Sequence, residues 1–155
     1  MIRPLIAVLL LLAAGSAQAQ APGCTYDTCA LRLRNRFWTG ISLVQGGDAR
    51  RVARLGLFAP HIDLLASAND SAKTHYLAFR TRQNRGGALL LVSAVFAGAA
   101  GGLLSEQATY DDHKTLFWSL LSVGFVFSVW GGADQVSARD QLQQAIWYYN
   151  RGLPR

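Results

Sequence analysis

The sequence predicts an α+β membrane protein, in which a small antiparallel β meander plus amphipathic helices are attached to a two-helix transmembrane hairpin. Three observations lead to this fold class. Two long runs contain no charged side chain, a stretch of period-two alternation precedes them, and only 15% of the 155 residues are charged. Soluble domains usually contain about 25% charged residues, so the low fraction favours a membrane protein.

The first 19 residues are expected to form a cleaved signal peptide. Arg3 gives a positive start, residues 5–14 are apolar, and residues 17–19 (Ala-Gln-Ala) fit the small-residue cleavage pattern. The apolar segment is too short to span roughly 30 Å of hydrocarbon as a helix. A retained anchor is one alternative. Lipidation of Cys24 is another, and the distance of Cys24 from the apolar segment argues against it.

Residues 20–85 are expected to form an exported basic region with a disulfide loop, a β meander and a helix. Cys24 and Cys29 are the only cysteines of the sequence. A chain that follows a secretory signal enters an oxidising compartment, so the pair predicts a disulfide. A metal site would need further ligands close by, and a redox pair usually has two residues between its cysteines rather than four.

The segment 30–57 is predicted to be a three-stranded antiparallel meander. Apolar and polar residues alternate at its start, which places Leu31 and Leu33 on one face and arginines on the other. Gly46-Gly47-Asp48 indicates a turn. The candidate anion-binding residues are Arg32, Arg34, Arg36, Arg50, Arg51 and Arg54. The alternative is a solvated basic face without a ligand.

Residues 86–105 and 115–133 are predicted to be transmembrane helices 1 and 2, joined by a short acidic loop, 106–114. At 1.5 Å per residue, each run forms a helix of about 30 Å, which matches the hydrocarbon core of a bilayer. The alternative is a pair of buried helices in a soluble domain. That arrangement would need more amphipathic chain than the sequence offers to cover both helices.

Both uncharged runs contain small residues at intervals of four, a pattern that lets helices approach closely in lipid. The candidate helix-packing residues are Ala94, Gly98 and Gly102 in the first run and Gly124, Ser128 and Gly132 in the second. Because the loop is short, we expect the two helices to pack on each other within one chain. Packing between two chains is the alternative.

Two amphipathic helices are expected to flank the hairpin. The first has a stripe formed by Ala72, Tyr76, Phe79 and Gln83, and it leads into the first run through Gly86-Gly87, which could bend it. The second occupies 134–155. We expect Tyr76 and Phe79 to pack against Ile146 and Tyr149. Alternatively, the aromatic residues 147–149 lie at a membrane interface.

The two signals for orientation conflict. Lys and Arg are normally enriched on the cytoplasmic side of membrane helices, which would place both flanks inside and the loop 106–114 outside. A signal peptide instead exports residues 20–85 and leaves the loop inside. Its three parts occur in the right order, so we predict an inner (cytoplasmic) membrane protein with its N-terminal region and C-terminal tail in the periplasm or cell exterior. Full export of a weakly apolar hairpin is a third alternative.

No catalytic motif is present, and His61, His75 and His113 are too dispersed to predict a metal site, so we expect no enzyme, metal or cofactor. Residues 20–86 carry ten basic and four acidic side chains. We therefore expect a non-enzymatic bacterial envelope protein that binds or scaffolds, contacting anionic lipid or wall polymers through its arginines. The expected partners are membrane lipid and another membrane protein or a second copy, not nucleic acid. The alternative is a small accessory subunit of a membrane assembly.

Overall fold

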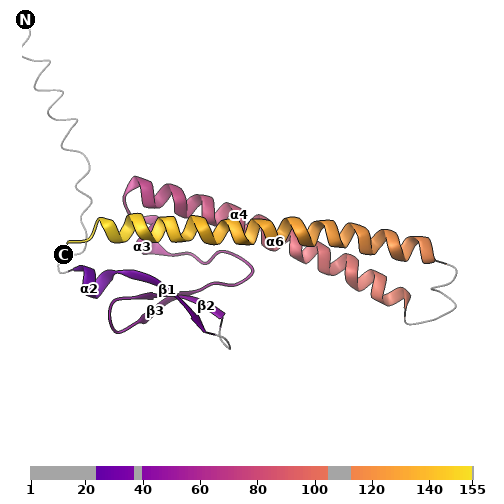
Figure 1. Cartoon of the computed structure of the whole chain (residues 1–155), viewed down its shortest axis with the longest axis horizontal. Coiled ribbons are helices and arrows are strands. Elements are labelled where there is room, and N and C mark those ends of the chain that lie inside the picture. Colours follow the sequence, from indigo (N-terminus) through magenta and orange to yellow (C-terminus); the bar gives the residue numbers. More distant parts are fainter. Residues whose placement is uncertain (1–23, 37–39, 105–112, 155) are drawn as a thin grey trace, which may run out of the picture.

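The computed structural model describes residues 24–36, 40–104 and 113–154. The predicted signal peptide and most of the acidic loop lie outside these ranges. Figure 1 shows a long antiparallel helix pair with a small sheet packed against one half of it. The elements in chain order are α2 (Tyr26–Cys29), β1 (Leu31–Arg36), β2 (Gly40–Gln45), β3 (Arg50–Arg54), α3 (Asp63–Ala66), α4 (Asp70–Leu103) and α6 (Lys114–Arg151).

The three strands form an antiparallel sheet in the order β1-β2-β3, which confirms the predicted meander. Leu33 lies opposite Leu43, and Leu43 lies opposite Ala53. The turn between β2 and β3 begins at Gly46, whose φ of +69° favours glycine. A Cβ at this position would also lie 2.7 Å from the carbonyl oxygen of Thr28. The glycine therefore fixes both the turn and the approach of α2.

The helix α4 begins at a side-chain cap and continues without interruption into the first uncharged run. Asn69 Oδ1 accepts a hydrogen bond of 2.9 Å from the backbone N–H of Ala72. The helix is 34 residues long and passes through Gly86 and Gly87. The amphipathic stretch and the first uncharged run are thus a single helix.

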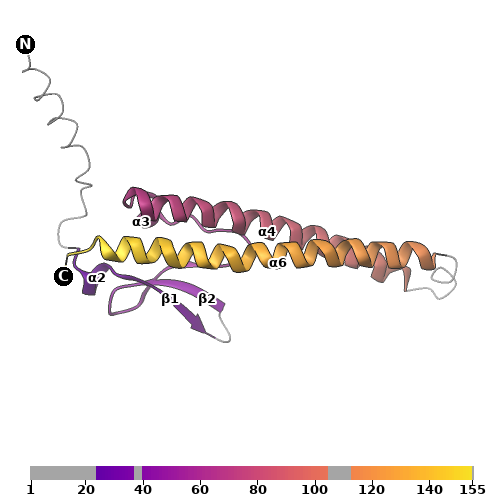
Figure 2. The ribbon, with the colours of Figure 1, turned by 45° about the horizontal axis from the view of Figure 1, so that its top comes forward.

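The second uncharged run and the C-terminal amphipathic segment are likewise one helix, α6, of 38 residues. It ends at Arg151, and Gly152 follows as its C-cap. Figure 2 shows α4 and α6 side by side in a second view, with the sheet again beside the half that holds the C-terminal end of α6. Along its length, the helix pair therefore has one half that packs against the sheet and a second half that extends beyond it.

The hydrophobic core lies between the inner face of the sheet and the first of these halves. It contains Tyr76 and Phe79 of α4 packed with Ile146 of α6, and Tyr149 adds to the cluster, as the amphipathic stripes predicted. The Tyr76 hydroxyl accepts a hydrogen bond of 2.7 Å from the backbone N–H of Ile62. Further members are Leu31, Leu43, Leu65, Ala138, Leu142 and Ala145.

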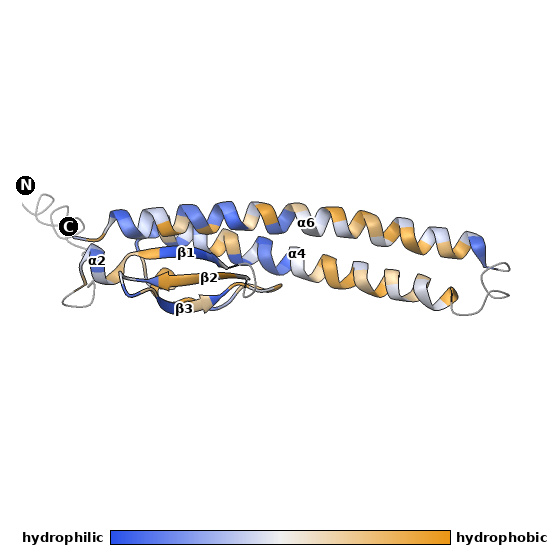
Figure 3. Ribbon diagram, turned by 60° about the horizontal axis from the view of Figure 1, so that its bottom comes forward, coloured by the Kyte–Doolittle hydropathy of each residue, from blue (hydrophilic) through white to orange (hydrophobic). Residues whose placement is uncertain are grey.

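The other half of the helix pair exposes apolar side chains. Figure 3 shows its ribbon as mostly apolar, whereas the half beside the sheet is mixed with polar residues. Val95 is 71% exposed and Phe125 is 70% exposed. Both helices are long and apolar enough to cross a membrane, and only 17% of the most apolar window of each is buried. The protein is thus a mixed α+β fold in which most of each uncharged run is exposed.

Candidate functional site: the outer face of the sheet

The strand register gathers arginines on the face of the sheet that is turned away from the helices. Arg32 of β1 lies opposite Val44, and Val44 lies opposite Arg51 of β3. Residues directly opposite each other in antiparallel strands point to the same face. These three residues therefore form one row across the sheet, with an arginine at each end.

A second row repeats the arrangement two residues along β2. Arg34 lies opposite Ser42, and Ser42 lies opposite Arg54. All four arginines are exposed, whereas Leu31 and Leu43, which point to the other face, are 1% and 0% exposed. We call the set Arg32, Arg34, Arg51 and Arg54 the arginine face.

The centre of the arginine face is small and well covered. Val44 is 6% exposed and Ser42 is 7% exposed, although both point away from the helix core. Arginine side chains carry hydrocarbon stems that can cover a neighbouring apolar surface while the guanidinium stays in water. The four exposed arginines belong to the two strands that flank this buried centre.

The arginine face has no neutralising partner among the residues that the structure describes. The ion pairs in this part of the chain join His61 to Asp63 and Arg85 to Asp134. Neither involves β1, β2 or β3. Four like charges on one small sheet repel each other, and a bound anion would reduce this repulsion.

The two other predicted arginines are placed differently. Arg36 is the last residue of β1, opposite Gly40. Arg50 lies opposite Gln45, the residue after Val44, so it does not belong to the rows of the arginine face. It lines a hollow together with Asp27 and Asp48. The structure therefore brings together four of the six predicted arginines, and Arg50 belongs to a local environment that already contains carboxylates.

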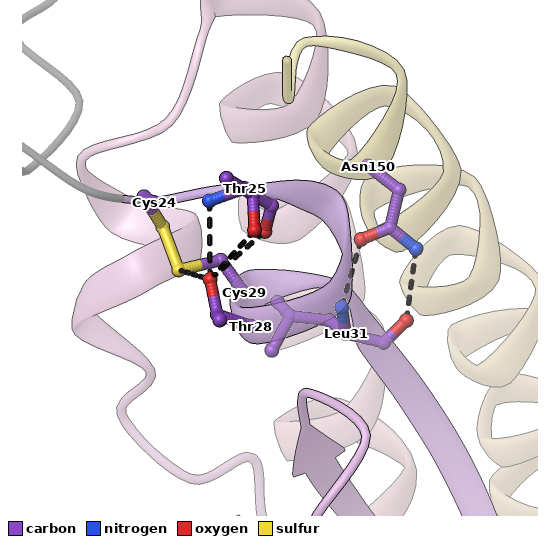
Figure 4. The surroundings of a disulfide bond; sticks show 6 residues. All are labelled: Cys24, Thr25, Thr28, Cys29, Leu31 and Asn150. Atoms are coloured by element: carbon purple, nitrogen blue, oxygen red, sulfur yellow. Dashed lines mark hydrogen bonds between the residues drawn. A yellow bond between two sulfur atoms is a disulfide. The ribbon is translucent and has the colours of Figure 1, made fainter. Parts of the chain in front are cut away.

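The cysteines lie next to the start of β1. Cys24 and Cys29 are at disulfide distance, with their Cα atoms 5.6 Å apart, which is compatible with the predicted disulfide. Figure 4 shows the pair in the short helical turn before β1 and, on the other side of that turn, Asn150 from the C-terminal end of α6 against Leu31. The Asn150 side chain accepts a hydrogen bond of 2.8 Å from the N–H of Leu31 and donates one of 2.9 Å to its carbonyl oxygen. The end of α6 thus holds the first residue of β1 in position.

The predicted small-residue stripes lie only in part between the two helices. A Cβ on Gly98, Gly102 or Gly132 would meet nothing within 4 Å beyond its own stretch of helix, so no close contact with the other helix forms at these Cβ positions. Ala94 is exposed and Ser128 is half-buried. Of the six predicted positions, Gly124 makes a close interhelix contact, since its Cβ would lie 3.2 Å from Cβ of Phe96. Packing between chains through the outward-facing residues stays a prediction.

The two helices come close together at Gly86 and Gly131, which are not among the predicted helix-packing residues. A Cβ on Gly86 would lie 2.8 Å from the carbonyl oxygen of Gly131. The reverse distance, from a Cβ on Gly131 to the carbonyl oxygen of Gly86, is 2.9 Å. The sequence signal for this contact is the pair of opposite charges next to it, since Arg85 and Asp134 form an ion pair between the two helices.

The histidines are separate in the structure. His61 contacts Asp63 at 2.8 Å, and His75 forms a hydrogen bond of 2.8 Å with Gln141. His113 is exposed immediately before α6. The described parts of the chain contain no cluster of three metal-ligating side chains.

Comparison with known proteins gives no relative: the chain matches no protein-family model, no curated protein and no solved structure at a significant level.

Proposed function

We propose that this chain is a non-enzymatic membrane protein of the bacterial envelope that binds a polyanion through the arginine face. The observation that carries the proposal is the pairing of two rows, Arg32 with Arg51 and Arg34 with Arg54, without a carboxylate partner in the described residues. The site offers a concentration of positive charge on one face of the sheet. Binding or scaffolding is the function that such a surface supports.

Exposure of the apolar half of the helix pair supports the membrane location. Contiguous apolar surface of this extent is rare on soluble monomers and usually marks a membrane or partner surface. Trp118 and Trp130 are 56% and 62% exposed near opposite ends of the second uncharged run. Exposed tryptophans at the two ends of a span are typical of the aromatic belts at membrane interfaces. In this proposal residues 86–105 and 115–133 cross the bilayer.

The direction of the arginine face favours one class of anion. Figures 1 and 3 show the strands running beside the helices, so the outer face of the sheet is turned sideways from the helix axes. If the helices cross a bilayer, the arginine face is roughly perpendicular to the membrane plane and does not face the lipid headgroups. An acidic wall polymer that passes beside the protein fits this geometry better than the headgroups of the membrane that holds it.

The binding proposal is tested with the full-length protein in nanodiscs of neutral lipid and an acidic wall polymer as ligand. The test variant is Arg51→Gln/Arg54→Gln, and the control is Arg50→Gln/Lys73→Gln, which removes the same charge outside the arginine face. We expect the test variant to weaken binding roughly 30-fold, since a basic group near an anionic surface contributes about 1 kcal/mol. Added salt should weaken the wild type for the same reason. Equal losses in both variants, or binding that does not respond to salt, would refute the proposal.

Orientation is tested separately by labelling with a membrane-impermeant maleimide. Single cysteines replace exposed Ser71 or His113 in a chain whose Cys24 and Cys29 are serine. The proposed inner-membrane location, with the sheet in the periplasm or cell exterior, predicts labelling at position 71 in intact cells and at 113 only after lysis. The reverse pattern would place the arginine face in the cytoplasm and remove wall polymers from its partners. Labelling of both positions in intact cells would indicate full export.

A second candidate function is that of a small accessory subunit in a membrane assembly. The observation that favours it is the outward direction of Gly98, with exposed Ala94 one helical turn away. Small residues on an uncovered helix face allow a partner helix, or a second copy, to approach closely in lipid. Gly98→Leu should then abolish copurification of the partner without unfolding the chain. Binding to wall polymer would be unaffected by the same change.

A further inference from the structure

A groove lies where the sheet, the loop that follows β3 and both long helices meet. It has a volume of about 520 Å³ and is lined mainly by apolar surface. Ile41 and Leu55 come from the sheet side, Leu90 comes from α4, and Val136 comes from α6. Pockets of this size are typical of sites for small organic molecules. We call it the junction groove.

The walls of the junction groove are fixed by hydrogen bonds. Gln83 Nε2 donates to the carbonyl oxygen of Gly56 at 2.6 Å, and Gln135 Nε2 donates to that of Leu57 at 2.9 Å. Both glutamines line the groove. These hydrogen bonds attach the loop after β3 to both helices, so the walls of the groove are held in place by the fold.

The position of the junction groove along the helices matters for what it can bind. The uncharged run of α4 begins at Gly86, and that of α6 ends at Ala133. Leu90 therefore lies about 6 Å inside the apolar half, and Arg139 lies about 9 Å beyond its limit, at 1.5 Å per residue. The groove extends across the level at which the proposed bilayer changes from hydrocarbon to headgroup.

The lining of the junction groove changes from apolar to charged along the helices, from the uncharged half toward the polar half. Leu90 and Gly132 lie at the apolar end, and Gly132 leaves open space because its missing Cβ would meet nothing within 4 Å. Arg139, at the polar end, is exposed, and it is the charged residue of the lining. The ion pairs of the described residues do not include it. An apolar channel that ends at a guanidinium matches an acyl chain joined to a phosphate.

We propose that the junction groove binds one anionic phospholipid, with an acyl chain along Leu90, Gly132 and Val136 and its phosphate at Arg139. The inference rests on the proposed membrane location, since only a chain inserted in lipid presents the groove at headgroup level. A free phosphate would engage Arg139 alone and leave the apolar lining uncovered. A polar, water-soluble metabolite would also leave the apolar lining uncovered.

The test uses the full chain in vesicles that contain a trace of phosphatidylglycerol with a photoactivatable acyl chain. Cross-linked residues are mapped by mass spectrometry. Gly132→Leu fills the groove, and Gly101→Leu is the matched control, because a Cβ at either position meets open space and the fold should persist. We expect cross-links at the groove lining to fall at least fivefold in Gly132→Leu and to remain in Gly101→Leu.

A second variant tests the charged end. Arg139→Gln should remove the preference for phosphatidylglycerol over phosphatidylcholine, whereas Lys73→Gln should keep it. Cross-links that are spread evenly over the apolar helix surface and unchanged by Gly132→Leu would overturn the proposal. Flotation of the vesicles after an alkaline wash distinguishes the two levels of failure. A chain that does not float with lipid refutes the membrane location, and one that floats without groove labelling refutes the lipid site alone.

Discussion

Arg85 and Asp134 form a two-point ion pair at the level where both long helices change from polar to uncharged sequence. Arg85 Nε and a terminal guanidinium nitrogen donate to the two carboxylate oxygens of Asp134, each at 2.6 Å. This bidentate geometry is the favourable one for arginine and carboxylate. The hydrogen bond from Arg85 is the main reason that the pKa of Asp134 lies below its ordinary value, and partial desolvation opposes that shift.

The first prediction concerns acid stability. Because the folded-state pKa of Asp134 is depressed, its contribution is present above its unfolded pKa of about 3.9 and is lost as the pH falls through the lower folded value. Asp134→Asn should therefore reduce the fall in thermal midpoint between neutral pH and pH about 3, measured in detergent micelles. The effect should be small, since the Arg85 side chain is 65% exposed. Asp140→Asn is the control, and an equal reduction there would contradict a specific role of the ion pair.

The second prediction concerns two adjacent glycines of α6. A Cβ on Gly131 would lie 2.9 Å from the carbonyl oxygen of Gly86, whereas one on Gly132 would meet nothing within 4 Å. Gly131→Ala should destabilise the helix pair by about 1–3 kcal/mol through overpacking. Gly132→Ala should stabilise it by about 0.5–1 kcal/mol, because alanine is the better helix former. Thermal unfolding followed by circular dichroism measures both, and shifts of the same sign would show that the helices do not meet at Gly131.

The third prediction concerns the link between α6 and the sheet. Replacing Asn150 with leucine removes both hydrogen bonds to the backbone of Leu31 and leaves two polar groups without partners. The expected cost is about 2–3 kcal/mol. Amide hydrogen exchange should show faster exchange at Leu31, with α4 unaffected. Gln143→Leu, an exposed change on the same helix, should leave exchange at Leu31 as in the wild type.

The fourth prediction concerns the cysteines. A disulfide between Cys24 and Cys29 closes a short loop and should contribute about 2 kcal/mol by restricting the unfolded chain. Reductant should therefore lower the thermal midpoint of the wild type and have no effect on Cys24→Ser/Cys29→Ser. The sheet should remain in the variant, because Tyr26 N–H also donates to the carbonyl oxygen of Pro154 at 3.0 Å. Absence of any response to reductant in the wild type would mean that the bond is not formed.

The parts of the fold that the sequence predicts are those governed by local periodicity. Alternation at Leu31 and Leu33 identifies the buried side of β1, and the turn at Gly46 sets the register that places Leu33 opposite Leu43. The stripe through Tyr76 and Phe79 identifies the face of α4 that joins the core. These patterns depend on neighbours within a few residues, so they can be read without the tertiary structure.

The parts that the sequence does not predict depend on how elements cross in space. Small residues occur on more than one side of α4, and the position of the other helix decides that Gly86 is in contact and Gly98 is not. The arginine face shows the same limit. Arg50 and Arg51 are neighbours in sequence, but the pairing of β2 with β3 places Arg51 opposite Val44 and sets Arg50 apart.

The contact between Asn150 and Leu31 joins residues 119 positions apart, and this separation constrains the order of assembly. The sheet emerges from the ribosome first, but Leu142 and Ile146, against which its inner face packs, are made near the end of synthesis. Until then Leu31 and Leu43 lack the part of their apolar cover that α6 provides. The predicted disulfide between Cys24 and Cys29, five residues apart, would be able to form long before. In a chain inserted as proposed, the sheet can pack on α6 only after the second helix has crossed the bilayer. The arginine face therefore reaches its final position only when membrane insertion is complete.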